Sequence, residues 1–239
     1  YTKAGYTRKL DRDCYLKYDA IFPIGEEVKE QFLKVYPECC GRTRVFHNII
    51  DPEKIRTKAL LPGGFQDDFG GIRLLTVGRL TEQKSYPVAI YAMKKIKERH
   101  KNVKWYVLGE GPKRKELEHL IASLGLQNDF ILLGSAENPY PYYKQADIYV
   151  HATGFEGKSI AIQEAQTIGL PIIASESSRE QITDGLDGIL CRLEPEAVCE
   201  AVCKMVEDEE LRKRYREASL KKNVVYEKDM ELLTGLLSG

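Results

Sequence analysis

The strongest constraint on the fold of this chain is a regular alternation of apolar and amphipathic segments that begins at residue 72. The apolar segments lie at residues 72–77, 103–108, 130–133, 148–150, 171–174 and 188–191, and the amphipathic segments at 86–99, 113–124, 140–145, 158–168 and 178–182. Short, nearly continuous apolar strands are typical of a parallel sheet that helices cover on both faces. The alternation therefore predicts an α/β fold with a doubly wound parallel sheet.

A glycine-rich loop separates this region from the start of the chain. Residues 61–71 hold four glycines and one proline, which is typical of a boundary or an exposed loop. Before this loop, apolar segments at 19–24 and 44–47 flank an amphipathic segment at 26–36. This pattern predicts a small strand–helix–strand unit of its own.

Residues 153–165, TGFEGKSIAIQEA, join a glycine-rich loop to an apolar-periodic helix that is expected to end at Gly169. The free N–H groups and the positive end of the helix dipole predict that a phosphate binds over residues 157–159. Glu164 lies eight residues beyond Glu156, about 12 Å along a helix. The two carboxylates are therefore not a close acid/base pair, but their spacing suits two polyols on either side of a phosphate bridge.

The ends of the predicted strands carry the other candidate binding residues, because ligands of open α/β sheets bind beyond the carboxyl ends of the strands. Glycine lets the backbone approach a ligand closely. Glycines stand at or near these ends at Gly78, Gly109, Gly111, Gly134, Gly154 and Gly157. Arg79 and Lys84 are the fixed cations of the first loop, and we expect them to neutralise a pyrophosphate together, Arg79 as a bidentate fork and Lys84 as a point charge.

Composition excludes some classes of function. The 36 basic residues balance the 36 acidic ones, so net charge gives no reason to expect a nucleic-acid partner. No apolar run approaches the roughly 18 residues of a membrane helix, and no signal peptide is visible. The six cysteines lack the C-x-x-C spacing of a zinc site, so we expect reduced thiols in a cytoplasmic protein. Because the first residue is Tyr1 rather than Met, we expect part of a longer protein.

Three segments together resemble the nucleotide-sugar-binding C-terminal domain of retaining family-4 glycosyltransferases of the GT-B fold. They are VGRLTEQK at 77–84, VLGEGP at 107–112 and EGKSIAIQEA at 156–165, of which the last matches that family's E-x7-E motif. The resemblance extends from about residue 18 to residue 219. It implies that residues 1–60 are the end of the N-terminal, acceptor domain with the interdomain link. Residues 61–222 would be the Rossmann-like donor-binding domain, and residues 223–239 a C-terminal helix that packs back toward the N-terminal part.

The resemblance implies a role for each candidate residue. Arg79 and Lys84 would hold the donor diphosphate and stabilise the leaving nucleoside diphosphate, and Glu164 would bind the ribose hydroxyls. Glu156, with the backbone amides of residues 157–160, would contact the donor sugar and the distal phosphate. Arg79, Lys84 and Glu156 are thus the expected catalytic residues. The expected donor-binding residues are Gly78, Gly109, Gly111, Gly134, Ser135, Gly157, Lys158, Ser159, Ile160 and Glu164, with the nucleobase against the loops after Leu108 and Leu133.

The implied activity is transfer of a hexose from a UDP- or GDP-sugar, with retention, to a saccharide or lipid-linked acceptor in glycan or polysaccharide biosynthesis. No metal or cofactor is expected, because the cations and the helix terminus do the charge work of a metal. The acceptor would bind the domain that the chain mostly lacks, so the chain by itself is expected to bind donor without turnover. Peripheral association with the inner face of the membrane is compatible with this activity.

Two residues depart from the family's pattern, and one histidine stands apart from it. Ser85 occupies a position where the family often has glycine, which bears on the turn after Lys84. The pair Lys158-Ser159 replaces a more usual aromatic or small pair, which bears on how the sugar is recognised. His151 stands at a strand end, where a packed or pocket-lining histidine is favoured over a catalytic base.

Three other functions remain alternatives. A non-catalytic nucleotide-sugar-binding module would use the same pocket, and a nucleotide-sugar epimerase would use the same fold. A nicotinamide-dependent oxidoreductase is disfavoured, because the first strand–helix turn has only Gly78 where a dinucleotide site needs G-x-G-x-x-G. The sequence does not specify the sugar, the base, the acceptor or the linkage.

Overall fold

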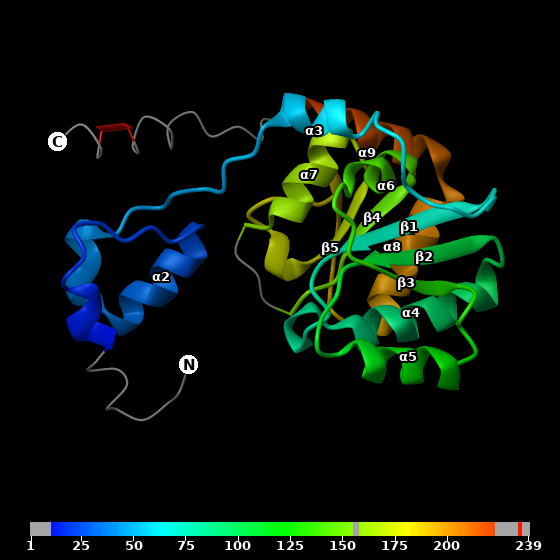
Figure 1. Ribbon diagram of the computed structural model, residues 1–239, viewed down its shortest axis with the longest axis horizontal. Coiled ribbons are helices and arrows are strands. Elements are labelled where there is room, and N and C mark those ends of the chain that lie inside the picture. The colour runs from blue at the N-terminus through cyan, green and yellow to red at the C-terminus, as the bar shows by residue number, and fades with distance from the viewer. Residues whose placement is uncertain (1–10, 155–157, 223–233, 236–239) are drawn as a thin grey trace. The chain divides into compact units, whose positions relative to one another are not determined.

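The computed structural model describes residues 11–154, 158–222 and 234–235. Backbone contacts divide the chain into two units, one formed by Tyr1–Ile49 with Tyr226–Gly239 and the other by Ile50–Val225. The larger unit contains every strand of the sheet and the helices from α3 onward (Figure 1).

The larger unit is a six-stranded sheet in which all neighbouring strands are parallel, with the order β3-β2-β1-β4-β5-β6. This confirms the predicted doubly wound α/β fold. The strands are β1 Ile72–Val77, β2 Val103–Leu108, β3 Phe130–Gly134, β4 Ile148–His151, β5 Ile172–Ser175 and β6 Gly188–Cys191. The helices are α3 Pro52–Lys58, α4 Tyr86–Arg99, α5 Arg114–Ser123, α6 Tyr140–Gln145, α7 Ile160–Ile168, α8 Pro195–Glu207 and α9 Glu209–Lys221.

Two apolar cores lie on the two faces of the sheet, because successive side chains of a strand point to opposite faces. Leu74 and Trp105 belong to the core that α4, α5 and α8 cover. Leu75 and Tyr106 belong to the core that α6 and α7 cover. In Figure 1, α4 and α5 lie below the sheet, and α6 and α7 lie above it. The two cores explain why the strands are mostly apolar on both faces, with Arg73 and Lys104 as the charged residues of β1 and β2.

The short helix predicted at 178–182 is instead a 3-10 turn, η3, at Glu176–Ser178. The sequence prediction placed one turn of helix too late, because Gln181 and Ile182 bond back to Ser178 without starting a longer helix. Another 3-10 turn, η2 at Glu82–Lys84, lies between β1 and α4.

The smaller unit contains α2 at Glu26–Val35 and the 3-10 helix η1 at Pro37–Arg42. The strands predicted at 19–24 and 44–47 were wrong: neither segment forms a strand, although Ile21 and Thr43 form an isolated parallel bridge and the N–H groups of Arg44 and Phe46 donate to the carbonyls of Ile21 and Pro23 at 3.0 and 2.9 Å. Two short segments without a third strand or an apolar face do not form a stable sheet. Consistent with this, α2 buries none of its residues.

The order of the strands fixes where a ligand can bind. The chain runs from β1 outward through β2 to β3, and then returns to the other side of β1 with β4. Such a reversal opens a crevice beyond the carboxyl ends of the two strands at the switch point, here β1 and β4. Within the described ranges, no helix combines the length and the apolar character needed to cross a membrane.

Candidate functional site

The loops that follow β1 and β4 meet at the switch point. The backbone carbonyl of Gln83 accepts two hydrogen bonds from the second loop, one from the Gly154 N–H at 3.0 Å and one from the Thr153 hydroxyl at 3.1 Å. The loop that carries Arg79 and Lys84 is therefore tied to the segment that leads into α7. Two of the predicted phosphate-binding elements thus lie at one edge of the sheet.

The loop after β1 also packs against the loop after β2. The Leu80 N–H donates to the Glu110 carbonyl at 3.0 Å. A Cβ at Gly109 would lie 2.0 Å from the Gly78 carbonyl oxygen, and one at Gly111 would lie 2.4 Å from the Leu80 carbonyl oxygen. Close backbone packing therefore requires glycine at 109 and 111, whether or not a ligand approaches them.

The two predicted cations differ in their surroundings. Lys84 is half-buried, and its Cε lies 3.3 Å from the position of a Cβ built on Gly78, so its side chain passes over the end of β1. Arg79 is exposed. Ser85 has a φ of 47° and a ψ of 35°, in the left-handed region, and it begins α4. The departure from glycine at this position therefore leaves a left-handed turn in place.

Glu164 is half-buried, with two tyrosine hydroxyls directed at its carboxylate. Tyr140 donates to Oε1 at 3.1 Å, and Tyr143 donates to Oε2 at 3.0 Å. Burial raises the pKa of Glu164, and the two hydrogen bonds oppose this rise. Burial, followed by the charge of Glu164, raises the pKa of Tyr140 to about 12, so this tyrosine stays a donor at neutral pH. The carboxylate of Glu164 is thus fixed by hydrogen bonds, whereas a glutamate on a helix is by default a solvated residue.

The start of α7 is held by a residue that the sequence pattern did not single out. The side-chain amide of Gln181 accepts from the Ser159 N–H at 2.5 Å and donates to the Ser159 carbonyl at 2.9 Å. Ser159 is buried, and its own hydroxyl makes no capping bond. Of the other predicted residues here, Lys158 is half-buried and Ile160 is exposed. Glu156 and Gly157 lie outside the described residues.

The end of β3 supplies the remaining predicted donor residues. Gly134 is buried with a φ of 84°, and Ser135 is exposed. A Cβ on Gly134 would lie 3.1 Å from Oε1 of Glu110, which pairs with Arg114 at 2.5 Å. The loops after β2 and β3 therefore meet here, where the nucleobase is expected.

Two serines at the carboxyl end of β5 anchor the loop after β4 from the other side. The Ser175 hydroxyl donates to the Thr153 carbonyl at 2.7 Å and accepts from the Thr153 N–H at 3.2 Å. The Ser177 hydroxyl donates to the same carbonyl at 3.1 Å. His151 is 2% exposed and lies beside Tyr149, whose hydroxyl is 3.2 Å from Nδ1. His151 is a packed residue, as the sequence favoured.

Sequence reasoning missed the side chains that hold this site. Tyr140 and Tyr143 stand three residues apart, a spacing that places them on the same face of α6, and the tyrosine-rich segment was a usable signal. Gln181 and Ser175 gave no such signal, because each bonds to a residue 22 positions away. Among the described residues, no group of three or more His, Cys, Asp or Glu side chains is arranged to hold a metal ion.

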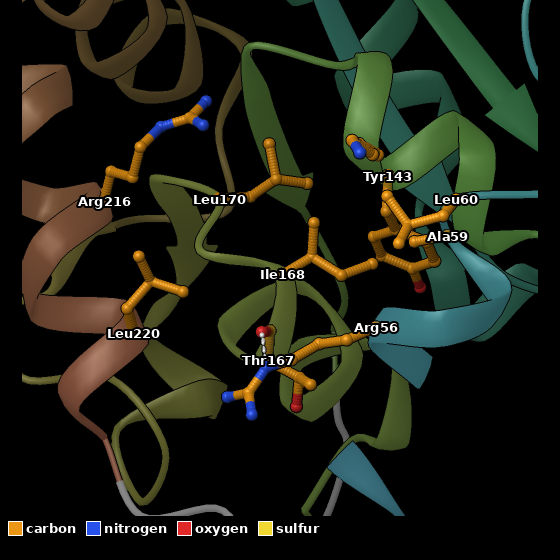
Figure 2. Close-up of a pocket in the computed structure, with 10 residues that line it drawn as sticks. Arg56, Ala59, Leu60, Tyr143, Thr167, Ile168, Leu170, Arg216 and Leu220 are labelled. Carbon is orange, nitrogen blue, oxygen red and sulfur yellow. Dashed lines mark hydrogen bonds between the residues drawn. The ribbon is translucent and has the colours of Figure 1, made fainter. Parts of the chain in front are cut away.

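The cavity drawn in Figure 2 lies between α3, α6, α7 and α9, and Tyr143 of α6 is part of its lining. It has a volume of about 340 Å³ and is lined by Leu170, which precedes β5, and by Thr167 near the end of α7. Figure 2 shows Arg56 of α3 reaching the Thr167 carbonyl, with Arg216 and Leu220 contributed by α9. This cavity is at the amino end of β5, away from the carboxyl edge where the predicted donor residues gather.

Comparison with known proteins gives the family. The family described as "Glycosyl transferases group 1" matches residues 68–222, more than half of the chain. The chain belongs to the group 1 glycosyltransferases. This family match confirms the glycosyltransferase relationship that the three sequence segments indicated.

Relatives and solved structures agree with this family. The chain is 30% identical over 206 residues to a Campylobacter jejuni N-acetylgalactosaminyltransferase that is named for a diphospho-undecaprenol-linked acceptor, and the match covers 84% of the chain and 54% of that enzyme. It is 28% identical over 241 residues to an uncharacterised glycosyltransferase of Methanocaldococcus jannaschii, covering 84% of the chain and 59% of the relative. This group 1 glycosyltransferase chain thus spans little more than half the length of these relatives.

The fold of this group 1 glycosyltransferase chain is similar to that of Anabaena HepE, solved with UDP and glucose. The TM-score is 0.82 at 16% identity, and the match covers 99% of this chain and 68% of that one. A glycosyltransferase of Rickettsia africae is similar with a TM-score of 0.75 at 20% identity, covering 99% of this chain and 67% of the other. Both likenesses concern the fold.

Proposed function

We propose that this chain is the donor-binding part of a retaining family-4 glycosyltransferase and that it binds a UDP- or GDP-sugar at the switch point between β1 and β4. The observation that carries this proposal is the geometry of Glu164, whose two carboxylate oxygens accept hydrogen bonds from tyrosine hydroxyls of α6. A fixed carboxylate of this kind suits the two vicinal hydroxyls of a ribose.

The proposed roles follow the charges at the carboxyl edge. Arg79 and Lys84 neutralise the diphosphate, and the start of α7 adds the positive end of a helix dipole. During transfer, the bond between the sugar C1 and the phosphate oxygen breaks, and a bond from C1 to the acceptor oxygen forms. The acceptor proton leaves with the nucleoside diphosphate. Fixed cations that stabilise the developing charge of this leaving group make a metal ion unnecessary.

The nature of the acceptor is proposed from the relatives. The Campylobacter enzyme is named for a lipid-linked saccharide acceptor, and a Bacillus subtilis relative is named as a poly(glycerol-phosphate) α-glucosyltransferase. We propose a saccharide or lipid-linked acceptor, bound through a domain that the longer relatives contain.

Calorimetry of the chain against UDP, GDP, their common sugar conjugates and the matching nucleosides tests the proposal. We expect binding of one nucleoside diphosphate and its sugar, with the free nucleoside much weaker. Binding by none of these ligands overturns the proposal. In a longer protein that includes the acceptor part, release of nucleoside diphosphate separates a transferase from a binding module. A changed sugar configuration without any acceptor would identify an epimerase.

A further inference from the structure

Gln181 lies on the stretch between η3 and β6, yet both ends of its side-chain amide are used at the start of α7. Oε1 accepts from the Ser159 N–H at 2.5 Å, and Nε2 donates to the Ser159 carbonyl at 2.9 Å. Gln181 is 4% exposed and Ser159 is 4% exposed, so water does not compete for these bonds. The side chain of an N-cap residue usually accepts from the N–H of the second or third helical residue. The Ser159 hydroxyl makes no such bond, and Gln181 instead holds the N–H and the carbonyl of the N-cap residue itself.

The backbone of Gln181 is held as firmly as its side chain. Its carbonyl accepts from Nε2 of Gln166 at 3.1 Å and from the ammonium group of Lys222. Lys222 also pairs with Asp187, which is 3% exposed. The end of α9 and the second half of α7 therefore fix the residue that caps α7.

This cap decides which amides the start of α7 presents. The first amides of a helix have no partner within the helix and are available to an anion. Because Gln181 takes the Ser159 N–H, that amide is not available to the phosphate that the sequence placed over residues 157–159, which corrects the prediction for Ser159; the direction of the neighbouring Ile160 N–H is fixed. We propose that Gln181 is a positioning residue of the donor site, which sets the start of α7 for the donor diphosphate by holding both peptide groups of Ser159. The inference rests on the proposed donor-binding function.

A pair of buried glutamines provides a matched test. Gln181→Met removes the amide that holds Ser159, whereas Gln166→Met removes an equally buried amide of α7 that donates to the Gln181 carbonyl, where the ammonium group of Lys222 remains as a second donor. Each removes buried hydrogen bonding, so both variants should lose stability. Calorimetry with the wild-type chain first selects UDP or GDP, and the matching nucleoside is measured beside it.

We expect Gln181→Met to raise the Kd of the nucleoside diphosphate about tenfold, equivalent to about 1.4 kcal/mol, with the Kd of the nucleoside unchanged. Gln166→Met should change both constants less than twofold. Equal changes for diphosphate and nucleoside, or no change in Gln181→Met, overturn the inference. If Gln181→Met does not fold, Gln181→Asn decides instead: it keeps the amide on a side chain too short to span both groups, and it should give the same selective loss. A wild-type chain that binds neither diphosphate overturns the proposed function itself.

Discussion

Glu164 combines burial with two hydroxyl donors, and the two donors fix the direction of its carboxylate. A carboxylate that accepts one hydrogen bond on each oxygen keeps lone pairs for a ligand while its rotamer stays fixed. We expect Glu164→Gln to weaken binding of the ribonucleoside diphosphate about tenfold and binding of its 2′-deoxy analogue far less, because the lost acceptor is assigned to the ribose hydroxyls and the analogue lacks one of them. Glu98→Gln, an exposed change on α4, is the control. Equal losses for the two nucleotides would make Glu164 a structural carboxylate.

Arg79 and Lys84 are assigned to the phosphates, so their removal should weaken binding of a charged ligand more than binding of an uncharged one. We expect Arg79→Ala and Lys84→Ala each to weaken binding of the nucleoside diphosphate by about 1.5–3 kcal/mol, the range for hydrogen bonds to charged groups, and binding of the nucleoside by much less. Lys101→Ala, on the exposed turn before β2, serves as the control. Titration calorimetry at two salt concentrations measures both effects. If a variant weakens binding of the diphosphate and of the nucleoside by the same factor, the substituted residue is not bound to the phosphates.

Ser85 stores strain that a single substitution can release. A residue with a Cβ in the left-handed region costs about 1–2 kcal/mol, whereas glycine adopts this region freely but loses more chain entropy on folding. We expect Ser85→Gly to stabilise the protein by about 0.5–1 kcal/mol, measured by urea unfolding. Ser85→Ala keeps the Cβ and loses only a hydroxyl bond of 3.5 Å to Gln83, so it should stay within about 0.5 kcal/mol of wild type. If Ala stabilises as much as Gly, the backbone at this turn is not strained.

At the scale of elements, one carboxylate of the segment at 61–71 takes three hydrogen bonds from side chains of the sheet. Asp67 accepts from the Tyr106 hydroxyl at 2.6 Å, from Arg73 at 3.1 Å and from Lys104 at 3.2 Å. Burial by itself raises the pKa of Asp67, but these three donors outweigh it and lower the pKa to about 2. The charged form is therefore the one that the folded state favours.

Asp67 should accordingly contribute stability that depends on pH. A lowered carboxyl pKa gives stability that is present above the unfolded value of about 4 and is lost as the pH falls toward 2. Because the side chain is 36% exposed, we discount the full linkage and expect Asp67→Asn to cost about 1 kcal/mol at pH 7. The difference from wild type should shrink between pH 4 and pH 2 in urea unfolding. Asp68→Asn is the exposed control, and a cost that is constant with pH would contradict the account.

The elements also show which parts of a structure a sequence can reveal. The sheet strands were predicted nearly to their ends, because burial on both faces leaves a mostly apolar run in each strand. The same pattern indicated which edge of the sheet carries the candidate site, because glycines and cations stand in the segments that follow the strands. The side-chain hydrogen bonds that hold the loops of the site were not predicted: Gln181 bonds to Ser159, and Ser175 bonds to Thr153, each across 22 residues. Such bonds depend on the packed sheet and leave no local periodicity.

At the scale of the whole chain, the two units differ in how much they bury. Both apolar cores of the described residues lie within the larger unit. In the smaller unit, α2 buries no residue, and Tyr18, Val35 and Ile49 are at least 40% exposed. Backbone hydrogen bonds without a core beneath them open locally at low free-energy cost. The stability of the chain therefore resides in the larger unit.

Hydrogen exchange of the 239-residue chain should display this division. We expect the amides of α2 to exchange orders of magnitude faster than those of β1 and β2, because their opening does not require loss of a core. Addition of the bound nucleoside diphosphate at 100 times its Kd stabilises the native state by about 2.7 kcal/mol and should slow exchange in the larger unit by up to about a hundredfold. The largest effects are expected at residues 78–84 and 158–161, with none in α2. The nucleoside alone is the control, because it lacks the phosphates assigned to both segments. Ligand protection of α2 equal to that of β1 would contradict a donor site confined to the larger unit.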